Sequence, residues 1–319
     1  MKFVKKEMKM ENKNNLLTKT PIVAALAMLC CALWGSASPL IKIGSRLCIP
    51  ESSVPSTMLF AGIRFAIAGF LTILIYSIAR RKILIPKLSN VGRVLTVSTF
   101  QTVLQYIFFY VGLSNTSSVK GAVLSGSNAF FALLISALIF RMEKLTAKKI
   151  VACVLGFVGI IVVNLQDLDL KMSFMGEGFV LISSVAYSIS SVLIKKFSKH
   201  EDPVVISGYQ FMVGGLFMIG VGMAFGGHVQ IITPAAWGVL LYLSLLSAVA
   251  YSLWGVLLKY NSVSKVSIYS FMIPVFGGLL SVLILPKEND VYPINLIITL
   301  VLIATGIFLI NYNGKRKDG

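Results

Sequence analysis

The sequence predicts an all-α integral membrane protein in which ten transmembrane helices form two inverted five-helix repeats. Three observations predict this fold: an apolar composition, ten apolar stretches of membrane-spanning length, and a similarity between the two halves of the chain. The 319 residues are 56% hydrophobic and 13% charged, with a mean hydropathy of +0.86, whereas soluble domains are about 25% charged. A soluble core of this size could not cover so much apolar surface, so most of it must face lipid.

Each apolar stretch has about the 17–25 residues that cross the hydrocarbon core of a bilayer. In chain order the predicted spans are 22–44, 55–79, 91–113, 119–140, 147–164, 174–193, 203–225, 233–258, 266–285 and 291–311. The connections between them are short, so we expect no inserted soluble domain. The predicted organisation is a tail over 1–20, a first repeat over 21–165, a second, inverted repeat over 172–313 and a tail over 314–319.

The first span carries a tryptophan, small residues and a proline in its middle. Trp34 lies near the centre of the span, whereas tryptophans in membrane helices favour the interfaces. Gly35 and Ser38 leave a face thin enough for a close helix contact. Pro39 removes a backbone hydrogen bond and can bend the outer third of the helix. Because freed carbonyls are tolerated only against protein or a water-filled cavity, both a packing seam and a cavity wall fit this segment.

The two halves of the chain align with each other without gaps over long segments. An offset of 145 places residues 106–120 on 251–265, and an offset of 153 aligns the first span with the sixth. Each half holds five spans, an odd number, so the second half enters the membrane inverted. Inverted repeats place a binding site near the midplane and permit alternating access, although a duplication can also persist only to build a stable bundle. The alignments pair Tyr106 with Tyr251, Phe109 with Trp254, Glu143 with Glu288, and Trp34 with Tyr187.

This organisation, with "LWGSASP" in the first span, resembles the drug/metabolite transporter superfamily, specifically its ten-helix EamA-type branch. The resemblance extends over residues 21–313 and implies a transporter of small metabolites, amino acids or drugs, often an exporter. The family often has a proline in the fourth span where this chain has Ala129, preceded by Asn128. The matching residues are Trp34, Gly35 and Pro39 in the first span, Arg64 in the second, Glu143 closing the fourth, Pro274 in the ninth and Glu288 closing it.

Aromatic and amide side chains near mid-span are the candidates for a substrate cavity. Aromatic walls suit apolar side chains or organic cations, and buried amides must face a neighbouring helix or a substrate. Gln101 and Gln105 are four residues apart and share a helical face. Core packing and plain interhelical hydrogen bonds are the alternatives for each. The substrate-binding candidates are Trp34, Ser38, Gln101, Gln105, Asn128, Tyr187, Tyr251 and Trp254, and the structural or gating candidates are Gly35, Pro39, Arg64 and Pro274.

Arg64 is the one strongly ionised residue well inside a predicted span. A charge at the bilayer centre costs about 2.5–3.5 kcal/mol on insertion scales, which indicates a definite role. Three roles stay open: binding a substrate carboxylate, snorkelling outward, or pairing with carbonyls at a broken helix. No Asp or Glu lies mid-span, since Glu177 is near the outer start of the sixth span. Without a buried carboxylate, proton coupling is disfavoured, and facilitated diffusion or another coupling ion remains open.

We therefore expect a transporter whose partners are a small-molecule substrate and the lipid bilayer, with an amino acid or amphipathic metabolite as the first substrate class. A cationic drug or a nucleoside is the alternative cargo, and a monomer is compatible with this organisation. The net charge of +17 could indicate nucleic acid, but no tract combines aromatic residues with a basic patch, so we expect no nucleic-acid partner. A membrane enzyme would need convergent ligands, yet His200 and His228 lie in loops on opposite sides. A non-transporting scaffold would need an output domain.

The cysteines indicate neither a disulfide framework nor a metal site. Cys30, Cys31, Cys48 and Cys153 show no metal-ligand or CxxC spacing. Buried free cysteines usually act as small apolar residues. We expect no metal and no cofactor.

The distribution of basic residues predicts that both chain ends lie in the cytoplasm. Placing the N-terminus inside puts 23 of the 29 Lys and Arg residues on that side and 5 on the other, as the positive-inside rule requires. A reporter that is active only in the cytoplasm should therefore work when fused at residue 1 or residue 319, and should fail when inserted between the first two spans. Activity at one chain end alone would contradict the even number of spans.

Overall fold

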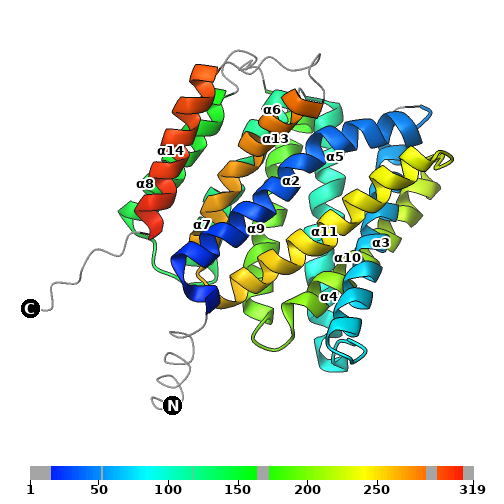
Figure 1. Ribbon diagram of the computed structural model, residues 1–319, viewed down its shortest axis with the longest axis horizontal. Coiled ribbons are helices and arrows are strands. Elements are labelled where there is room, and N and C mark those ends of the chain that lie inside the picture. The colour runs from blue at the N-terminus through cyan, green and yellow to red at the C-terminus, as the bar shows by residue number, and fades with distance from the viewer. Residues whose placement is uncertain (1–15, 52, 117, 164–171, 285–292, 312–319) are drawn as a thin grey trace, which may run out of the picture.

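The computed structural model describes residues 16–51, 53–116, 118–163, 172–284 and 293–311. All regular elements within these ranges are helices (Figure 1). Nine stretches of them are long and apolar enough to cross a membrane. A tenth helix, α8 (Ala147–Val163), has 17 residues, at the short end of the spanning range. The predicted all-helical, ten-span membrane fold is thus confirmed. Most of the two predicted tails and Glu288 lie outside the described residues.

Each half of the chain supplies five spans, several of them built from more than one helical segment. The first half consists of η1 (Leu16–Thr18), α2 (Thr20–Cys48), α3 (Val54–Ala79), η2 (Leu88–Asn90), α4 (Val91–Ser98), η3 (Thr99–Leu104), α5 (Gln105–Ser114), α6 (Ser118–Ser125), α7 (Asn128–Leu134), η4 (Ile135–Ile139) and α8. The second half consists of η6 (Phe174–Gly178), α9 (Phe179–Phe197), α10 (Pro203–Ala224), α11 (Pro234–Tyr260), α12 (Val263–Ser267), η7 (Ile268–Phe271), α13 (Met272–Ile284) and α14 (Pro293–Asn311). Among these, η3, η4 and η6 are π-helical.

Three spans begin with a capping side chain followed within two residues by a proline. Ser53, Asp202 and Thr233 precede α3, α10 and α11, and each accepts a hydrogen bond from a backbone N–H two or three residues further on. A proline occupies the first or second helical position in all three, where its fixed φ suits the helix and its missing donor is not needed. These local signals set the starts of the second, seventh and eighth spans.

The first helix of each half packs against helices of the other half. In the first half α2 packs against α11 and α13, while its counterpart α9 packs against α5 and α7. The counterparts α3 and α10 contact each other, as do α8 and α14, and these two pairs lie at opposite flanks of the molecule (Figure 1). The start of α2 and the end of α14 point to the same side. A two-fold operation that swaps the halves reproduces every one of these contacts, as an inverted repeat requires.

Glycines bring the backbones of α3 and α10 into direct contact. An offset of 146 places Gly62 and Gly69 on Gly208 and Gly215. A Cβ atom on Gly69 would lie 2.5 Å from the carbonyl oxygen of Gly208, and one on Gly215 would lie 2.8 Å from that of Gly62. The same contact is therefore made twice, once by each half. Small residues at such positions are what permits close packing of helices in lipid.

The second pair, α8 and α14, repeats this pattern. An offset of 147 pairs Gly159 with Gly306 and Ala152 with Thr299. A Cβ atom on Gly159 would lie 3.3 Å from the carbonyl oxygen of Thr299, and one on Gly306 would lie 2.7 Å from that of Ala152. The Thr299 hydroxyl also donates to the carbonyl of Gly159 at 2.8 Å. Equivalent residues thus make equivalent contacts at both flanks.

Two spans that the sequence predicted as continuous are broken at matching points. In the ninth span, η7 separates α12 from α13, because Pro274 cannot donate to the carbonyl of Ser270 and its ring crowds that carbonyl. In the fourth span, where Ala129 stands at the proline position, the break falls at Gly126 and Ser127, between α6 and α7. By contrast, α2 continues past Pro39 to Cys48, so this proline does not interrupt the first span.

Each break is held by one side chain of the neighbouring half. The Ser184 hydroxyl of α9 donates to the carbonyl of Leu124 at 3.3 Å, and the Cys31 thiol of α2 donates to the carbonyl of Tyr269 at 3.1 Å. The repeat offsets pair Ser184 with Cys31 and Leu124 with Tyr269. All four cysteines are buried and without a disulfide, but Cys31 is more than an apolar filler, since its thiol adds a second hydrogen bond to a carbonyl that also accepts from the backbone nitrogen of Met272.

The glycine contact between α3 and α10 can be tested with a pair of alanine variants. Gly215→Ala places a Cβ atom 2.4 Å from the backbone nitrogen of Ala66, whereas the Cβ of Gly220→Ala, on the same helix, meets nothing within 4 Å. Overpacking of this kind costs about 1–3 kcal/mol, while alanine otherwise favours a helix by about 1 kcal/mol over glycine. The melting temperature of the detergent-solubilised protein should fall for Gly215→Ala and hold or rise for Gly220→Ala. Equal melting of the two variants would show that the helices are not in backbone contact.

Candidate functional site

Four aromatic rings meet where the two halves of the chain face each other. The hydroxyl groups of Tyr106 and Tyr251 are hydrogen-bonded at 2.8 Å. Phe65 and Phe211, paired by the offset of 146, stack with ring centroids 5.0 Å apart and planes inclined by 6°. Phe65 contacts Tyr106 at 4.5 Å, and Phe211 contacts Tyr251 at 4.7 Å. Equivalent residues can touch each other only near the two-fold axis, so this aromatic group marks the axis.

The predicted aromatic candidates adjoin this group. Trp34 lies fourteen residues from each end of α2, and its ring centroid is 5.0 Å from those of both Tyr251 and Trp254, in edge-on geometry. Tyr187, the counterpart of Trp34, is buried in the same cluster of side chains as Tyr106. Trp254 is only six residues before the end of α11, further from mid-helix than its place in the sequence indicated. The structure thus brings all four predicted aromatic residues together.

The three predicted amides lie on the third and fourth spans beside helix irregularities. Gln101 is buried within the π-helical segment η3, and Gln105 directly follows it. Asn128 begins α7 immediately after the break, where its backbone carbonyl accepts a hydrogen bond from Ser188 at 2.9 Å. Irregular turns of this kind often occur at functional sites.

Five polar atoms of the predicted substrate-binding residues are buried without a hydrogen-bond partner in the described part of the chain. They are Nε1 of Trp34 and Trp254 and the side-chain oxygens of Gln101, Gln105 and Asn128. Leaving such a group unsatisfied costs about 1–3 kcal/mol, and native proteins contain few of them. Donors and acceptors that have no protein partner are available to water or to a bound solute.

Ser38 and the structural candidates have different surroundings. Ser38 is exposed, whereas the nearby Ser36 is buried and its hydroxyl lies 2.9 Å from that of Tyr242 in α11. A Cβ atom on Gly35 would lie 2.8 Å from the backbone nitrogen of Gly277, so this glycine permits the contact of α2 with α13. Pro39 is buried within α2. Gly35 and Pro39 therefore shape the packing of the first span.

Arg64 is buried in the middle of α3, with 4% of its surface exposed. Its guanidinium carbon lies 4.3 Å from the centroid of the Phe65 ring. The charge interacts with the hydroxyl groups of Tyr106, Tyr110 and Tyr251. A side chain in this position does not snorkel to the membrane surface, and within the described ranges it bonds to no carbonyl of a broken helix. Its Nε has no hydrogen-bond partner there.

Gln210 is a residue of the site that the sequence reasoning missed. Its carbonyl oxygen accepts from Ser98 at 2.8 Å and its side-chain oxygen from Thr102 at 2.6 Å, which anchors the irregular third span on α10. Its side-chain nitrogen lacks a partner in the described chain. The signal that could have found it is the offset of 146, which places Gln210 and Phe211 on Arg64 and Phe65.

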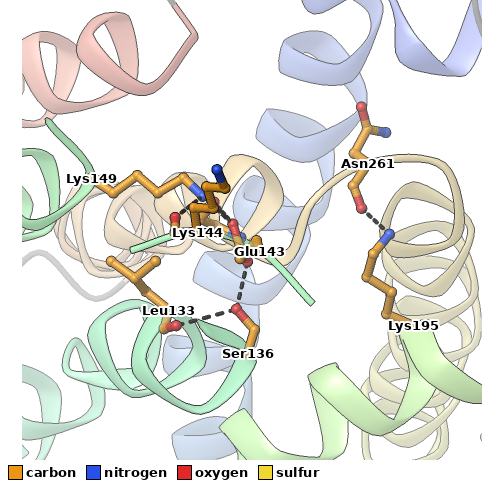
Figure 2. Close-up of polar contacts among 8 residues, drawn as sticks. Leu133, Ser136, Glu143, Lys144, Lys149, Lys195 and Asn261 are labelled. Carbon is orange, nitrogen blue, oxygen red and sulfur yellow. Dashed lines mark hydrogen bonds and ion pairs between the residues drawn. The ribbon is translucent and has the colours of Figure 1, made fainter. Parts of the chain in front are cut away.

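Glu143 connects the end of the fourth span to the start of the ninth, as Figure 2 shows for its contacts with Ser136 and Lys149. It accepts hydrogen bonds from the Ser136 hydroxyl and Lys149 Nζ, both at 2.5 Å, and from the backbone nitrogen of Ser264 at 3.1 Å. Burial raises the pKa of Glu143, but the hydrogen bonds from Lys149, Ser136 and Ser264 outweigh it and hold the pKa below the ordinary value of 4.5.

Further polar contacts tie other spans together at the same face. Lys195 donates to the carbonyls of Leu258, at 2.9 Å, and Asn261 (Figure 2). The Asn261 side chain donates to the carbonyl of Leu17 at 2.8 Å. These contacts connect α9, the end of α11 and the start of the first span, so Glu143 is part of a polar layer that joins the two halves at the face where α2 begins.

The opposite face has a carboxylate of its own. Glu177 accepts from the Thr116 hydroxyl at 2.6 Å and from the backbone nitrogen of Ser173 at 2.7 Å, and it forms an ion pair with Lys120 at 3.2 Å. It thereby links the third, fourth and sixth spans. At each face, therefore, a carboxylate outside the central aromatic group joins neighbouring spans to each other.

The two histidines do not converge with other metal-binding side chains. The backbone carbonyl of His200, between α9 and α10, accepts from Asn90 at 3.1 Å. The backbone nitrogen of His228, between α10 and α11, donates to Ser56 at 3.0 Å. Among the described residues, no group of three or more His, Cys, Asp and Glu side chains is arranged to hold a metal ion.

Comparison with known proteins gives one consistent result. The sequence profile of the EamA-like transporter family matches residues 21–165 and 174–312. The uncharacterized transporter YvbV of Bacillus subtilis is 26% identical over 315 residues, which is 94% of each chain. An uncharacterized transporter of Archaeoglobus fulgidus is 25% identical over 80% of this chain and 86% of its own. A crystal structure superimposes with a TM-score of 0.74 over 90% of this chain and 97% of the other at 16% identity, a likeness of fold alone.

The polar layer at Glu143 generates a pH-dependent prediction. Glu143→Gln removes the charge that Lys149 faces, and should lower the free energy of unfolding by about 1–3 kcal/mol near pH 7. Because the folded pKa is depressed, the stability due to the carboxylate is present above pH 4.5 and is lost as the pH falls through the lowered pKa. The melting-temperature gap between wild type and variant should therefore narrow between about pH 7 and pH 3.5. Glu51→Gln, at an exposed position, is the control, and a constant gap would contradict the assignment.

Proposed function

The chain belongs to the EamA-like transporter family, and on that premise we propose that it carries a small amphipathic metabolite, with amino acids as the first substrate class, out of the cell across the cytoplasmic membrane. Membership makes it a multi-pass membrane transporter. The export direction rests on the family resemblance, and the cytoplasmic placement of both chain ends rests on the distribution of Lys and Arg.

The observation that carries this proposal is the set of five polar atoms of the candidate substrate-binding residues that have no hydrogen-bond partner in the described chain. Trp34 and Trp254 offer N–H donors next to apolar ring faces, and three amides offer oxygen acceptors. A solute that is apolar on one part and hydrogen-bonding on another matches both features. An anchor or scaffold protein would instead be expected to satisfy these groups internally, because unpaired polar groups in the membrane are costly.

Alternating access provides the mechanism that fits this arrangement. The fourth and ninth spans are broken at equivalent positions, and broken helices in inverted repeats are typical of transport sites. We assign the pivot to the Tyr106–Tyr251 contact, because residues near a two-fold axis move least when the halves exchange roles. Opening the face at which α2 begins would require Glu143 to release Ser264, since this contact joins the fourth and ninth spans.

A transport assay with matched tryptophan variants tests the proposal. Purified protein is first screened for thermal stabilisation by amino acids, nucleosides, sugars and cationic drugs, and the stabilising solute is then used in proteoliposome flux measurements. Trp34→Ala should reduce flux about tenfold, the effect of losing roughly 1–2 kcal/mol of aromatic contact. Trp237→Ala, on α11 with 48% of its surface exposed, is the control and should leave flux unchanged.

The result also separates the alternative cargoes. Flux that saturates with an amino acid supports the first substrate class, and flux confined to a cationic drug or a nucleoside replaces it. Unchanged flux in Trp34→Ala and in Asn128→Ala would remove both residues from the site. The absence of flux for every solute in the panel would contradict transport itself.

A further inference from the structure

The charge of the central site departs from the two-fold symmetry. Arg64 in α3 and Gln210 in α10 occupy equivalent positions, each directly before a phenylalanine of the stacked pair. The glycine contacts on either side are reproduced by both halves, so the backbone frame is symmetric there. A cation is present in one half and a neutral amide in the other. Packing of the two helices does not require this difference, because the same frame accommodates both residues.

The surroundings of Arg64 provide no counter-charge. With 4% of its surface exposed, the side chain is enclosed by the Phe65 ring and by tyrosines whose hydroxyl groups are neutral. Arg80, Lys120 and Lys149 form ion pairs with carboxylates, whereas no carboxylate within the described part of the chain pairs with Arg64. A guanidinium keeps its charge in proteins. A buried cation without an anionic partner is strongly disfavoured unless a partner is supplied.

The missing partner has a definite chemistry. The unpartnered Nε–H of Arg64 is a donor, and a guanidinium presents its donors in a fork that matches the two oxygens of a carboxylate. The contact of Arg64 with the Phe65 ring leaves an anion as the natural complement, because a cation–π contact alone contributes only about 0.5–2 kcal/mol. Trp34 contacts both Tyr251 and Trp254, so apolar ring surface is available within the same group of side chains.

We propose that Arg64 is the anion-binding residue of the transport site and that the transported solute carries a carboxylate, which binds Nε–H of Arg64 while its apolar part contacts the aromatic rings around Tyr251. This inference rests on the proposed transport function and narrows the substrate to amino acids and other organic monocarboxylates. Gln210 is neutral, so the opposite side of the axis presents no second cation to the solute.

Matched acids and amides test this proposal on the unmodified protein. L-phenylalanine and L-leucine are compared with L-phenylalaninamide and L-leucinamide, in which a neutral carboxamide replaces the carboxylate, and 3-phenylpropionate tests the carboxylate without the amine. Binding is measured by calorimetry and thermal shift, and uptake by flux in proteoliposomes. A hydrogen bond to a charged group is worth enough that at least one acid should bind at least about tenfold more tightly than its amide.

Variants then identify the residue responsible. Arg64→Gln installs the side chain that the other half already carries at this position, and should bring acid and amide to within about twofold of each other. Arg80→Gln, at the end of the same helix with an exposed side chain paired to Asp202, is the control and should retain the preference. Should Arg64→Gln fail to fold, the wild-type comparison of acids with amides still decides the proposal.

The outcomes distinguish this inference from the proposed function. Equal binding of acids and amides by the wild type, or transport confined to a sugar, a nucleoside or a cationic drug, would overturn the carboxylate inference and leave transport intact. A preference for acids that survives in Arg64→Gln would also overturn the assignment of Arg64. Absence of flux for every solute in both panels would instead contradict the proposed function.

Discussion

Hydrocarbon offers no hydrogen-bond partners, and this constraint governs how the chain can depart from regular helix. The fourth and ninth spans depart from the regular α-helix at matching points. At each point a side chain of the neighbouring half, Ser184 or Cys31, adds a hydrogen bond to a backbone carbonyl that already has a local partner. The irregular backbone of each half is therefore in direct hydrogen-bonded contact with the other half. The same constraint applies to the buried side-chain polar atoms that have no protein partner: lipid cannot satisfy them, so water or a solute must.

The contacts of the two halves show how far symmetry extends through the molecule. It holds at both flanking helix pairs, where glycines meet carbonyls in duplicate, and at the axis, where Tyr106 meets Tyr251 and Phe65 meets Phe211. It fails in the chemistry of the side chains that surround the axis. The residue equivalent to Trp34 in the other half is Tyr187, and the residue equivalent to Arg64 is Gln210. A symmetric frame can open alternately to both sides, while an unsymmetric lining can hold a solute that itself has unlike ends.

Much of the fold could be predicted from sequence because lipid makes apolar length and internal repetition direct evidence. The spans, the inverted halves and the central position of Trp34 all follow from these signals. The break in the fourth span could not be foreseen, since Ala129 occupies the place of the proline and Gly126 is one of many glycines in the chain. The π-helical turn at Gln101 leaves no mark in an apolar run. Gln210 carries no signal within its own span and stands out only when the second and seventh spans are aligned. Ser36, and not the predicted Ser38, is the buried serine, because the pattern of small residues does not indicate which of them faces the protein.

The position of Arg64 near the axis also bears on how a charged solute could be carried. When inverted halves exchange conformations, groups at the faces change partners, as the contact of Glu143 with Ser264 must when its face opens. In the proposed cycle of alternating access, groups at the axis would keep their depth, because residues near a two-fold axis move least when the halves exchange roles. Arg64 contacts Phe65, which is itself one of the axis residues. A carboxylate held there would stay paired with the same cation while access passes from one side to the other, so the site would not need to return the anion to an apolar surrounding at any stage of the cycle. Placing the single mid-membrane charge beside the axis therefore separates the binding of an anion from the opening and closing of the two faces.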